Sequence, residues 1–211
     1  MVQAGNEFIF ALRERRPVSS RHVLAYLSLC ILLALLPGLA RGEHPELLLI
    51  ADPGMDNPIF QRSVILVTPH ENGGAMGVIL NRPIPVDPDR LYPGDELLAE
   101  AEQVFFGGPV RPGLLIYLFR ADTAPERAVH LFDDVYFSID RELLASQLRR
   151  PREESSLQFY AGYSGWAPGQ LQAEILHGGW SLIEANTELL FDTDRNQIWY
   201  QLTQGQRKAW Y

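Results

Sequence analysis

Short apolar runs separated by turn residues make up most of the chain after residue 46. Residues 47–51 and 63–68 are apolar or β-branched, a composition typical of buried strands. The turn residues 71–74 (ENGG) follow the second run, and residues 75–80 are apolar again, so this stretch predicts a β-hairpin. Further strands are predicted at residues 104–106, 114–119, 128–132, 157–161 and 180–184.

Helical patterns are fewer than strand patterns. Asp95 is suited to cap a short helix that ends near residue 103, because its side chain can accept hydrogen bonds from free backbone amides. Ser138 is suited to cap a second helix, whose apolar face begins at Ile139. Strands and helices follow one another without a strict βαβ rhythm, so the predicted fold class is α+β. Two more helices are predicted at residues 169–177 and 196–204, and loops at residues 83–93 and 162–169.

The N-terminal part has a different pattern. Residues 23–40 are apolar and carry no charge, and four arginines precede them. Pro37 and Gly38 interrupt this run near its end, and Ala40 supplies a small residue. A basic region, an apolar region and small residues in this order predict a secretory signal peptide that is cut after Ala40. We therefore expect residues 1–40 to be a signal peptide or membrane anchor, and residues 41–211 to be one domain.

Two other interpretations of residues 23–40 remain open. The run is nearly long enough to stay in the membrane as an uncleaved anchor, or it could be a buried core helix. The sequence thus predicts a periplasmic or otherwise exported protein, either free of the membrane or anchored in the inner membrane by this segment alone. Cell fractionation, together with mass spectrometry of the mature N-terminus, would separate these interpretations.

Charge narrows the class of partner. The formal net charge is −8, and removing the four arginines and two glutamates of the first 40 residues brings it to −10. Lys208 is the only lysine. A surface with this charge repels phosphate backbones and anionic lipids, which disfavours nucleic acid as a partner. The one cysteine, Cys30, lies in the apolar segment, so the domain has no disulfide, thiolate nucleophile or cysteine zinc site.

Residues that could carry catalysis do not form a known motif. His70, His130 and His177 are widely spaced and lack the spacing of paired metal ligands. Ser164 lies in the sequence GYSGW, which resembles a nucleophile elbow but has Trp166 where the second glycine is needed. We therefore assign no catalytic residue, no metal site and no cofactor. A hydrolase whose histidine and aspartate residues are gathered by the fold stays open as an alternative.

Polar residues next to apolar runs are the better binding candidates. Arg62 precedes a predicted buried strand, and Asn81 and Arg82 follow another. Either arginine could pair with a carboxylate, such as Asp52 or Asp56, or bind a ligand. The candidate binding residues are Arg62, Asn81, Arg82, Gly107, Gly108 and Gln170.

Four stretches together carry a family resemblance: residues 52–64 (DPGMDNPIFQRSV), 74–83 (GAMGVILNRP), 106–110 (FGGPV) and 162–171 (GYSGWAPGQL). In these stretches the chain is similar to the YqgE/AlgH family of bacterial proteins. The resemblance covers nearly the whole domain. It implies a single compact domain with a bent, partly barrel-like mixed sheet flanked by helices.

The resemblance implies less about function. The AlgH name carries a suggested role in regulating the transcription of alginate genes, and no catalytic residue or cofactor transfers with it. This chain differs from the family pattern in its segment at residues 23–40, since most members look cytosolic, and in Ser164, where many relatives have alanine. Three hypotheses follow, in order of preference: a non-catalytic binding or regulatory module of the bacterial envelope with an unknown small molecule or protein partner, a hydrolase, and a transcriptional regulator.

Overall fold

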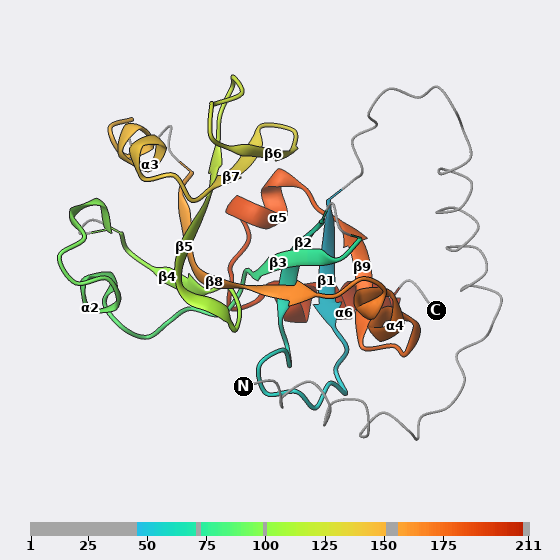
Figure 1. Ribbon diagram of the computed structural model, residues 1–211. Helices are drawn as coiled ribbons and strands as arrows, with labels where there is room; N and C mark the ends of the chain where they lie inside the picture. Colours follow the sequence, from blue (N-terminus) through green and yellow to red (C-terminus); the bar gives the residue numbers. More distant parts are fainter. Residues whose placement is uncertain (1–45, 71–72, 99–100, 151–155, 209–211) are drawn as a thin grey trace, which may run out of the picture. The chain divides into compact units, whose positions relative to one another are not determined.

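The computed structural model describes residues 46–70, 73–98, 101–150 and 156–208 (Figure 1). The predicted signal segment, residues 1–40, lies outside these ranges. Glu43–Tyr211 form one compact unit. In the part of the chain that the structure describes, no helix is long and apolar enough to cross a membrane.

The strands of the described residues form one sheet (Figure 1). Their order is β6-β7-β5-β8-β3-β2-β1-β9, and β4 also pairs with β8. Neighbours are antiparallel except for β4, which runs parallel to β8. The strands are β1 (Leu47–Ala51), β2 (Val64–Pro69), β3 (Ala75–Ile79), β4 (Val104–Phe106), β5 (Val110–Arg120), β6 (Val129–Phe132), β7 (Val135–Ser138), β8 (Gln158–Trp166) and β9 (Trp180–Glu184).

Strand β8 joins the two halves of this sheet. Residues Gln158 to Ala161 and Tyr163 pair with β5, whereas Ser164 to Trp166 pair with β3. Gly162, with a φ of 70°, lies just before this change of partner. A left-handed residue takes the backbone out of the extended region and bends the strand. The sheet curls into a half-barrel with helices packed around it, which confirms the predicted α+β class and bent sheet.

The side chains of β5 pack into two hydrophobic cores. Ile116 and Leu118 belong to the larger core, which β1, β2 and α6 also build. Leu115, Tyr117 and Phe119 belong to a second core, to which α3 contributes Leu144. Successive side chains of a strand point to opposite faces, so a strand buried on both faces has a continuous apolar run rather than an alternating one.

Side-chain caps and indole contacts position the helices. The carboxylate of Asp140 accepts from the backbone amide of Leu143 at 2.8 Å and caps α3. The indole of Trp199 donates to the carbonyl of Ala51 at 2.9 Å and holds α6 against β1. The helices are α2 (Pro88–Leu91), the 3-10 turn η1 (Glu96–Leu98), α3 (Arg141–Leu148), α4 (Gln170–Leu176), α5 (Thr187–Phe191) and α6 (Ile198–Lys208).

Several predicted strand boundaries were wrong. The predicted loop at 162–169 begins as strand, because β8 continues to Trp166 by pairing with β3. Strand β5 starts at Val110, four residues before the predicted run, because Val110 pairs with Tyr163. Strand β7 was not predicted. In each case a partner distant in sequence supplies the hydrogen bonds that local patterns do not reveal.

Helix boundaries also differ from the prediction. The predicted loop at 83–93 contains α2, which Asp87 caps. The helix expected after Asp95 is the single 3-10 turn η1. Ser138 does not cap α3; its hydroxyl accepts from the amide of Asp140 at 3.0 Å, and Asp140 is the cap. Helix α5 was not predicted.

Candidate functional site

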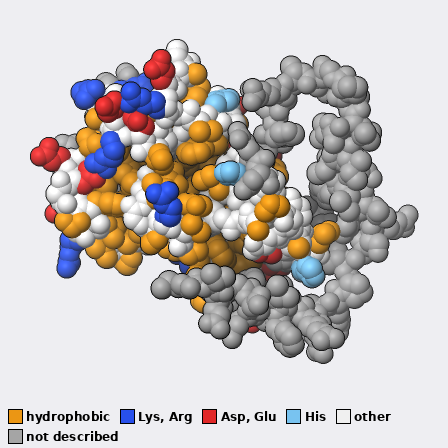
Figure 2. Space-filling model, in the orientation of Figure 1, with side chains coloured by type: hydrophobic (Ala, Val, Ile, Leu, Met, Phe, Trp, Pro, Cys, Tyr) orange, Lys and Arg blue, Asp and Glu red, His pale blue; other side chains and the backbone are white. Residues whose placement is uncertain are grey.

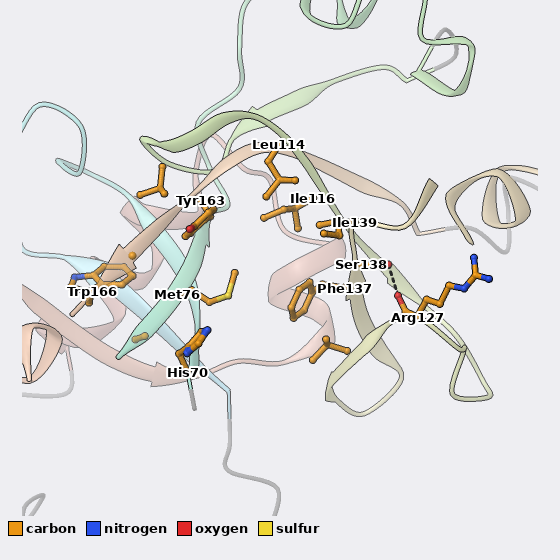
Figure 3. Close-up of a pocket in the computed structure, with 14 residues that line it drawn as sticks. His70, Met76, Leu114, Ile116, Arg127, Phe137, Ser138, Ile139, Tyr163 and Trp166 are labelled. Carbon is orange, nitrogen blue, oxygen red and sulfur yellow. Dashed lines mark hydrogen bonds between the residues drawn. The ribbon is translucent and has the colours of Figure 1, made fainter. Parts of the chain in front are cut away.

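A groove of about 570 Å³ lies on the concave side of the half-barrel (Figure 3). Its walls come from β3, β5, β7 and β8, which the curl of the sheet brings around one space. Figure 2 shows hydrophobic side chains gathered over the middle of the domain face in this view. The lining residues are His70, Ala75, Met76, Val110, Leu114, Ile116, Arg127, Val129, Phe137, Ser138, Ile139, Tyr163, Gly165 and Trp166.

The groove narrows toward the interior of the half-barrel. A smaller void of about 20 Å³ shares Met76, Ile116 and Phe137 with it. Leu131 of β6 lines this void together with Leu66 of β2, so β6 closes over the concave face at this end. Apolar side chains make nearly all of this inner wall, which favours an apolar occupant.

The polar groups at the groove are largely engaged with the protein itself. The Ser138 hydroxyl donates to the carbonyl of Arg127 at 2.6 Å. The Arg127 guanidinium pairs with Asp140 at 3.5 Å and with Glu142. In Figure 3 the Arg127 side chain points away from the groove, so it contributes mainly backbone to the wall. The groove is thus an apolar surface with few free hydrogen-bonding groups.

A wide bulge in β5 forms one end of the groove. Val110 pairs with Tyr163, and the next paired residue of β5 is Leu115, opposite Ala161. Arg111, in the bulge, is exposed and has a φ of 48°, which is unfavourable for a residue with a Cβ. Val110, directly before the bulge, and Leu114, its last residue, line the groove. The bulge therefore shapes the groove as well as bending the sheet.

Three of the sequence-predicted binding residues lie together, but around a loop and not in the groove. Asn81 joins β2 to β3: its side-chain oxygen accepts from the amide of Val64 at 2.9 Å, and its nitrogen donates to the carbonyl of Arg62 at 2.9 Å. Arg82 donates to the carbonyls of Pro58 and Gln61, at 3.1 and 3.0 Å. Burial lowers the pKa of Arg82.

Arg62 contacts the C-terminal helix. Its guanidinium donates to the hydroxyl of Tyr200 at 3.2 Å and lies 5.9 Å from the centre of that ring. A cation over an aromatic face is stabilised by the ring quadrupole. Asp52 and Asp56 were the predicted carboxylate partners of Arg62 and Arg82. Among the described residues neither carboxylate pairs with these arginines, and Asp52 accepts from the amide of Gly54.

The remaining three predicted residues lie elsewhere. Gly107 and Gly108 pack directly against the backbone of β8, where an added Cβ would lie 2.2 Å from the Gly162 oxygen and 2.3 Å from the Tyr163 carbonyl carbon. Gln170 begins α4, accepts from the amide of Ala167 and donates to Glu174. None of the six predicted residues is among those that line the groove. A ligand-binding role for them stays a prediction.

The residues considered for catalysis have structural contacts. His130 bonds to the backbone oxygen of Asp133 at 2.9 Å, and His177 to that of Ala173 at 2.6 Å. Ser164 is fully buried, and its hydroxyl donates to the carbonyl of Gly107 at 3.3 Å. Within the described ranges, no group of three or more potential ligands could hold a metal ion.

Glu46, directly before β1, is a buried carboxyl beside the concave face. It is 8% exposed; its Oε1 accepts from the Thr68 hydroxyl at 3.1 Å, and its Oε2 has no hydrogen-bond partner among the described residues. Burial raises the pKa of Glu46 to about 7, because removal from water disfavours the carboxylate. The Thr68 hydrogen bond and the nearby His130 offset this only in part.

Glu46 is expected to make the domain less stable as pH rises from about 4.5 to about 7. Over that range the carboxyl ionises in the unfolded chain but stays protonated in the folded protein, so folding is disfavoured by up to about 3 kcal/mol at pH 7 and above. Glu46→Gln cannot ionise and should remove this part of the pH dependence. Urea unfolding of both proteins at pH 5 and pH 8 checks this. An equal loss of stability in the two proteins would contradict it.

The sequence interpretation missed the groove for a specific reason. Ile139 was predicted to lie on the buried face of a helix, but it precedes α3 and is 55% exposed in the groove wall. Met76 looked like an ordinary strand residue, and Phe137 lay outside the predicted strands. The available signal was two apolar residues, Val129 at the start of β6 and Ile139 directly after β7.

Comparison with known proteins decides the family. The AlgH-like family model matches residues 48–210. The chain belongs to the AlgH-like family. It is 35% identical over 163 residues to a UPF0301 protein of Shewanella frigidimarina, covering 74% of this chain and 87% of the relative. It is 36% identical over 170 residues to a UPF0301 protein of Streptomyces avermitilis, covering 76% and 85%.

Solved structures share the AlgH-like fold. The AlgH protein from Pseudomonas aeruginosa superposes with a TM-score of 0.62 at 22% identity, covering 81% of this chain and 92% of that one. Protein DIP2367 from Corynebacterium diphtheriae superposes with a TM-score of 0.60 at 23% identity, covering 78% and 88%. These matches confirm the family predicted from the four motif stretches, and none of these names states a reaction or a ligand.

Proposed function

We propose that this AlgH-like domain is a non-catalytic binding module, whose groove takes an apolar segment of a partner molecule. The observation that carries the proposal is the groove of about 570 Å³, walled mostly by apolar side chains and open to solvent. Val129 and Ile139 remain 50% and 55% exposed on its wall. Exposed apolar surface that forms a concave site is typical of ligand and partner recognition.

The contacts of the titratable groups favour binding over hydrolysis. A hydrolase of the kind considered needs a histidine oriented by a carboxylate beside the substrate. His130 and His177 instead bond to backbone oxygens, and Ser164 is enclosed under Gly107.

The charge distribution also favours binding of a protein or apolar ligand over DNA. A DNA-binding regulator needs arginines gathered on one face. The candidates in the sequence are Arg141, Arg149, Arg150 and Arg152, of which Arg152 lies outside the described residues. Arg141 forms a bidentate pair with Asp95, and Arg150 donates to Gln147 at 3.3 Å. Acidic and basic side chains are intermixed around α3 in Figure 2, so this surface is not a basic face.

The proposal is tested with a neutral apolar fluorophore, N-phenyl-1-naphthylamine, titrated against the purified protein. The double variant Val129→Asn, Ile139→Asn makes two exposed groove-wall positions polar without opening a buried cavity. We expect it to weaken binding of the probe at least about fivefold, since apolar contact area drives the association. Circular dichroism melting shows whether the variants remain folded.

The matched control is Leu182→Asn on β9. Leu182 is also an exposed apolar strand residue, at 37%, and does not line the groove. Its substitution should leave the affinity of the probe within about twofold of the parent. If the control weakens binding as much as the double variant, or if the double variant has no effect, the groove is not the binding surface.

A further inference from the structure

Strand β6 ends the sheet beside the groove, and no strand of the described residues pairs with its outer edge. It pairs with β7 along one edge, and it is the terminal strand in the sheet order of the described residues. The outward N–H and C=O groups of an edge strand are a template for another extended chain. Edge strands that avoid such pairing usually carry lysine, proline or inward charges. β6 has the sequence Val-His-Leu-Phe and carries no lysine, proline or carboxylate; it is four residues long, and its pairing with β7 is irregular between His130 and Phe132.

The side chains on one face of β6 point toward the groove. Val129 lines the groove, and Leu131, two residues later, lines the void below it. Phe137, paired with Val129 on β7, lines both. A strand added to β6 would continue this pattern, because neighbouring strands share the direction of their side chains. Every second side chain of the added strand would then point toward the groove.

Carboxylates outnumber free cations around β6. Asp133 and Asp134 follow it directly, and Glu126 lies three residues before it. Arg120 pairs with Asp134 at 2.7 Å, and Arg127 pairs with Asp140 and Glu142, so the carboxylates here without an ion pair in the described residues are Glu126 and Asp133. The chain after residue 40 also has a net charge of −10. An occupant with basic residues at its ends therefore complements this surface.

We propose that β6 docks an extended peptide segment of a partner protein, which adds to the half-barrel as a further strand. Its alternate apolar side chains enter the groove, and basic residues flank them. This inference rests on the proposed groove binding and specifies the conformation, side-chain spacing and charge of the occupant. Backbone hydrogen bonds hold the segment, and the groove selects its side chains.

The test begins with a display library of random seven-residue peptides, selected on the purified protein. We expect the enriched peptides to have apolar residues at alternate positions and lysine or arginine at the ends. A synthetic copy of one enriched peptide is then N-methylated on the amides of alternate residues, in two versions. The version that methylates the β6-facing edge should lose at least about tenfold in affinity, and the other version should lose little, since only one edge pairs with β6.

A protein variant supplies the matching evidence. Val129→Lys places a charge on the groove side of β6, and we expect it to weaken the peptide at least about tenfold. Leu182→Lys on β9, the other end of the sheet, should change the affinity less than about twofold.

Strand addition is overturned if no peptide is enriched, if the enriched apolar residues recur at helical spacing, or if both N-methylated versions bind like the parent peptide. In those cases groove binding still stands, provided that the Val129→Asn, Ile139→Asn variant weakens the naphthylamine probe. If that variant leaves the probe unaffected, the proposed function itself fails.

Discussion

Gly108→Ala is expected to lower the free energy of unfolding by more than about 3 kcal/mol, because the new methyl group has no space and the backbone cannot adapt. An ideal Cβ at this position would lie 2.3 Å from the carbonyl carbon of Tyr163 and 2.4 Å from the amide nitrogen of Ser164. Both neighbours are backbone atoms of β8, which is paired on both sides. Gly108 also has a φ of 152°, which disfavours any residue with a side chain.

Thermal and urea unfolding of the variant measure this effect. The control is Gly113→Ala in the β5 bulge, where an added Cβ would meet nothing within 4 Å. It should shift stability by less than about 0.5 kcal/mol, the usual range for a surface substitution. If the free energy of unfolding of Gly108→Ala lies within about 0.5 kcal/mol of the parent value, residues 107–108 do not approach β8 as closely as described.

Glu174→Ala is expected to cost about 2–4 kcal/mol, because one carboxylate oxygen serves two tryptophans. The indoles of Trp166 and Trp180 both donate to Glu174 Oε2, at 3.0 and 2.9 Å. Both side chains are buried, so water cannot readily replace the lost acceptor. A buried donor without a partner keeps its full desolvation cost.

Glu174→Gln is the matched variant, since it keeps an oxygen of the same size at the same place. It should be more stable than Glu174→Ala but less stable than the parent. The remaining loss of stability arises because its amide would face the Gln170 amide, which donates to Glu174 Oε1 at 3.0 Å in the parent. Urea unfolding, followed by tryptophan fluorescence, reports stability and indole environment together. Equal stability of the alanine and glutamine variants would show that the indole bonds contribute nothing.

These two sites also explain why the motif residues predict the family better than they predict a binding surface. Gly107 and Gly108 let two strands approach closely, and Gln170 contacts Glu174, which in turn anchors Trp166 and Trp180. Asn81 ties β2 to β3. Such residues are constrained by geometry that any protein with this fold must reproduce, whatever it binds.

Local chemistry was enough to predict much of the architecture. The hairpin of β2 and β3 follows from two apolar runs around a glycine-rich turn, and the structure pairs Val67 with Gly77 in that hairpin. Strands β1 and β9 and helices α4 and α6 also lie close to the predicted ranges. In these segments the apolar period and the turn residues agree with the tertiary contacts.

The sequence by itself determined the family, the α+β class, the acidic charge of the domain and the strands of the main core, because each depends on composition, local periodicity or long motifs. Only the tertiary structure decided that β8 continues through Gly162, that Val110 begins β5, and that Val129 and Ile139 flank a groove. Those features depend on which strands pair. Pairing is settled by hydrogen bonds and packing between residues far apart in the chain, which no local pattern records.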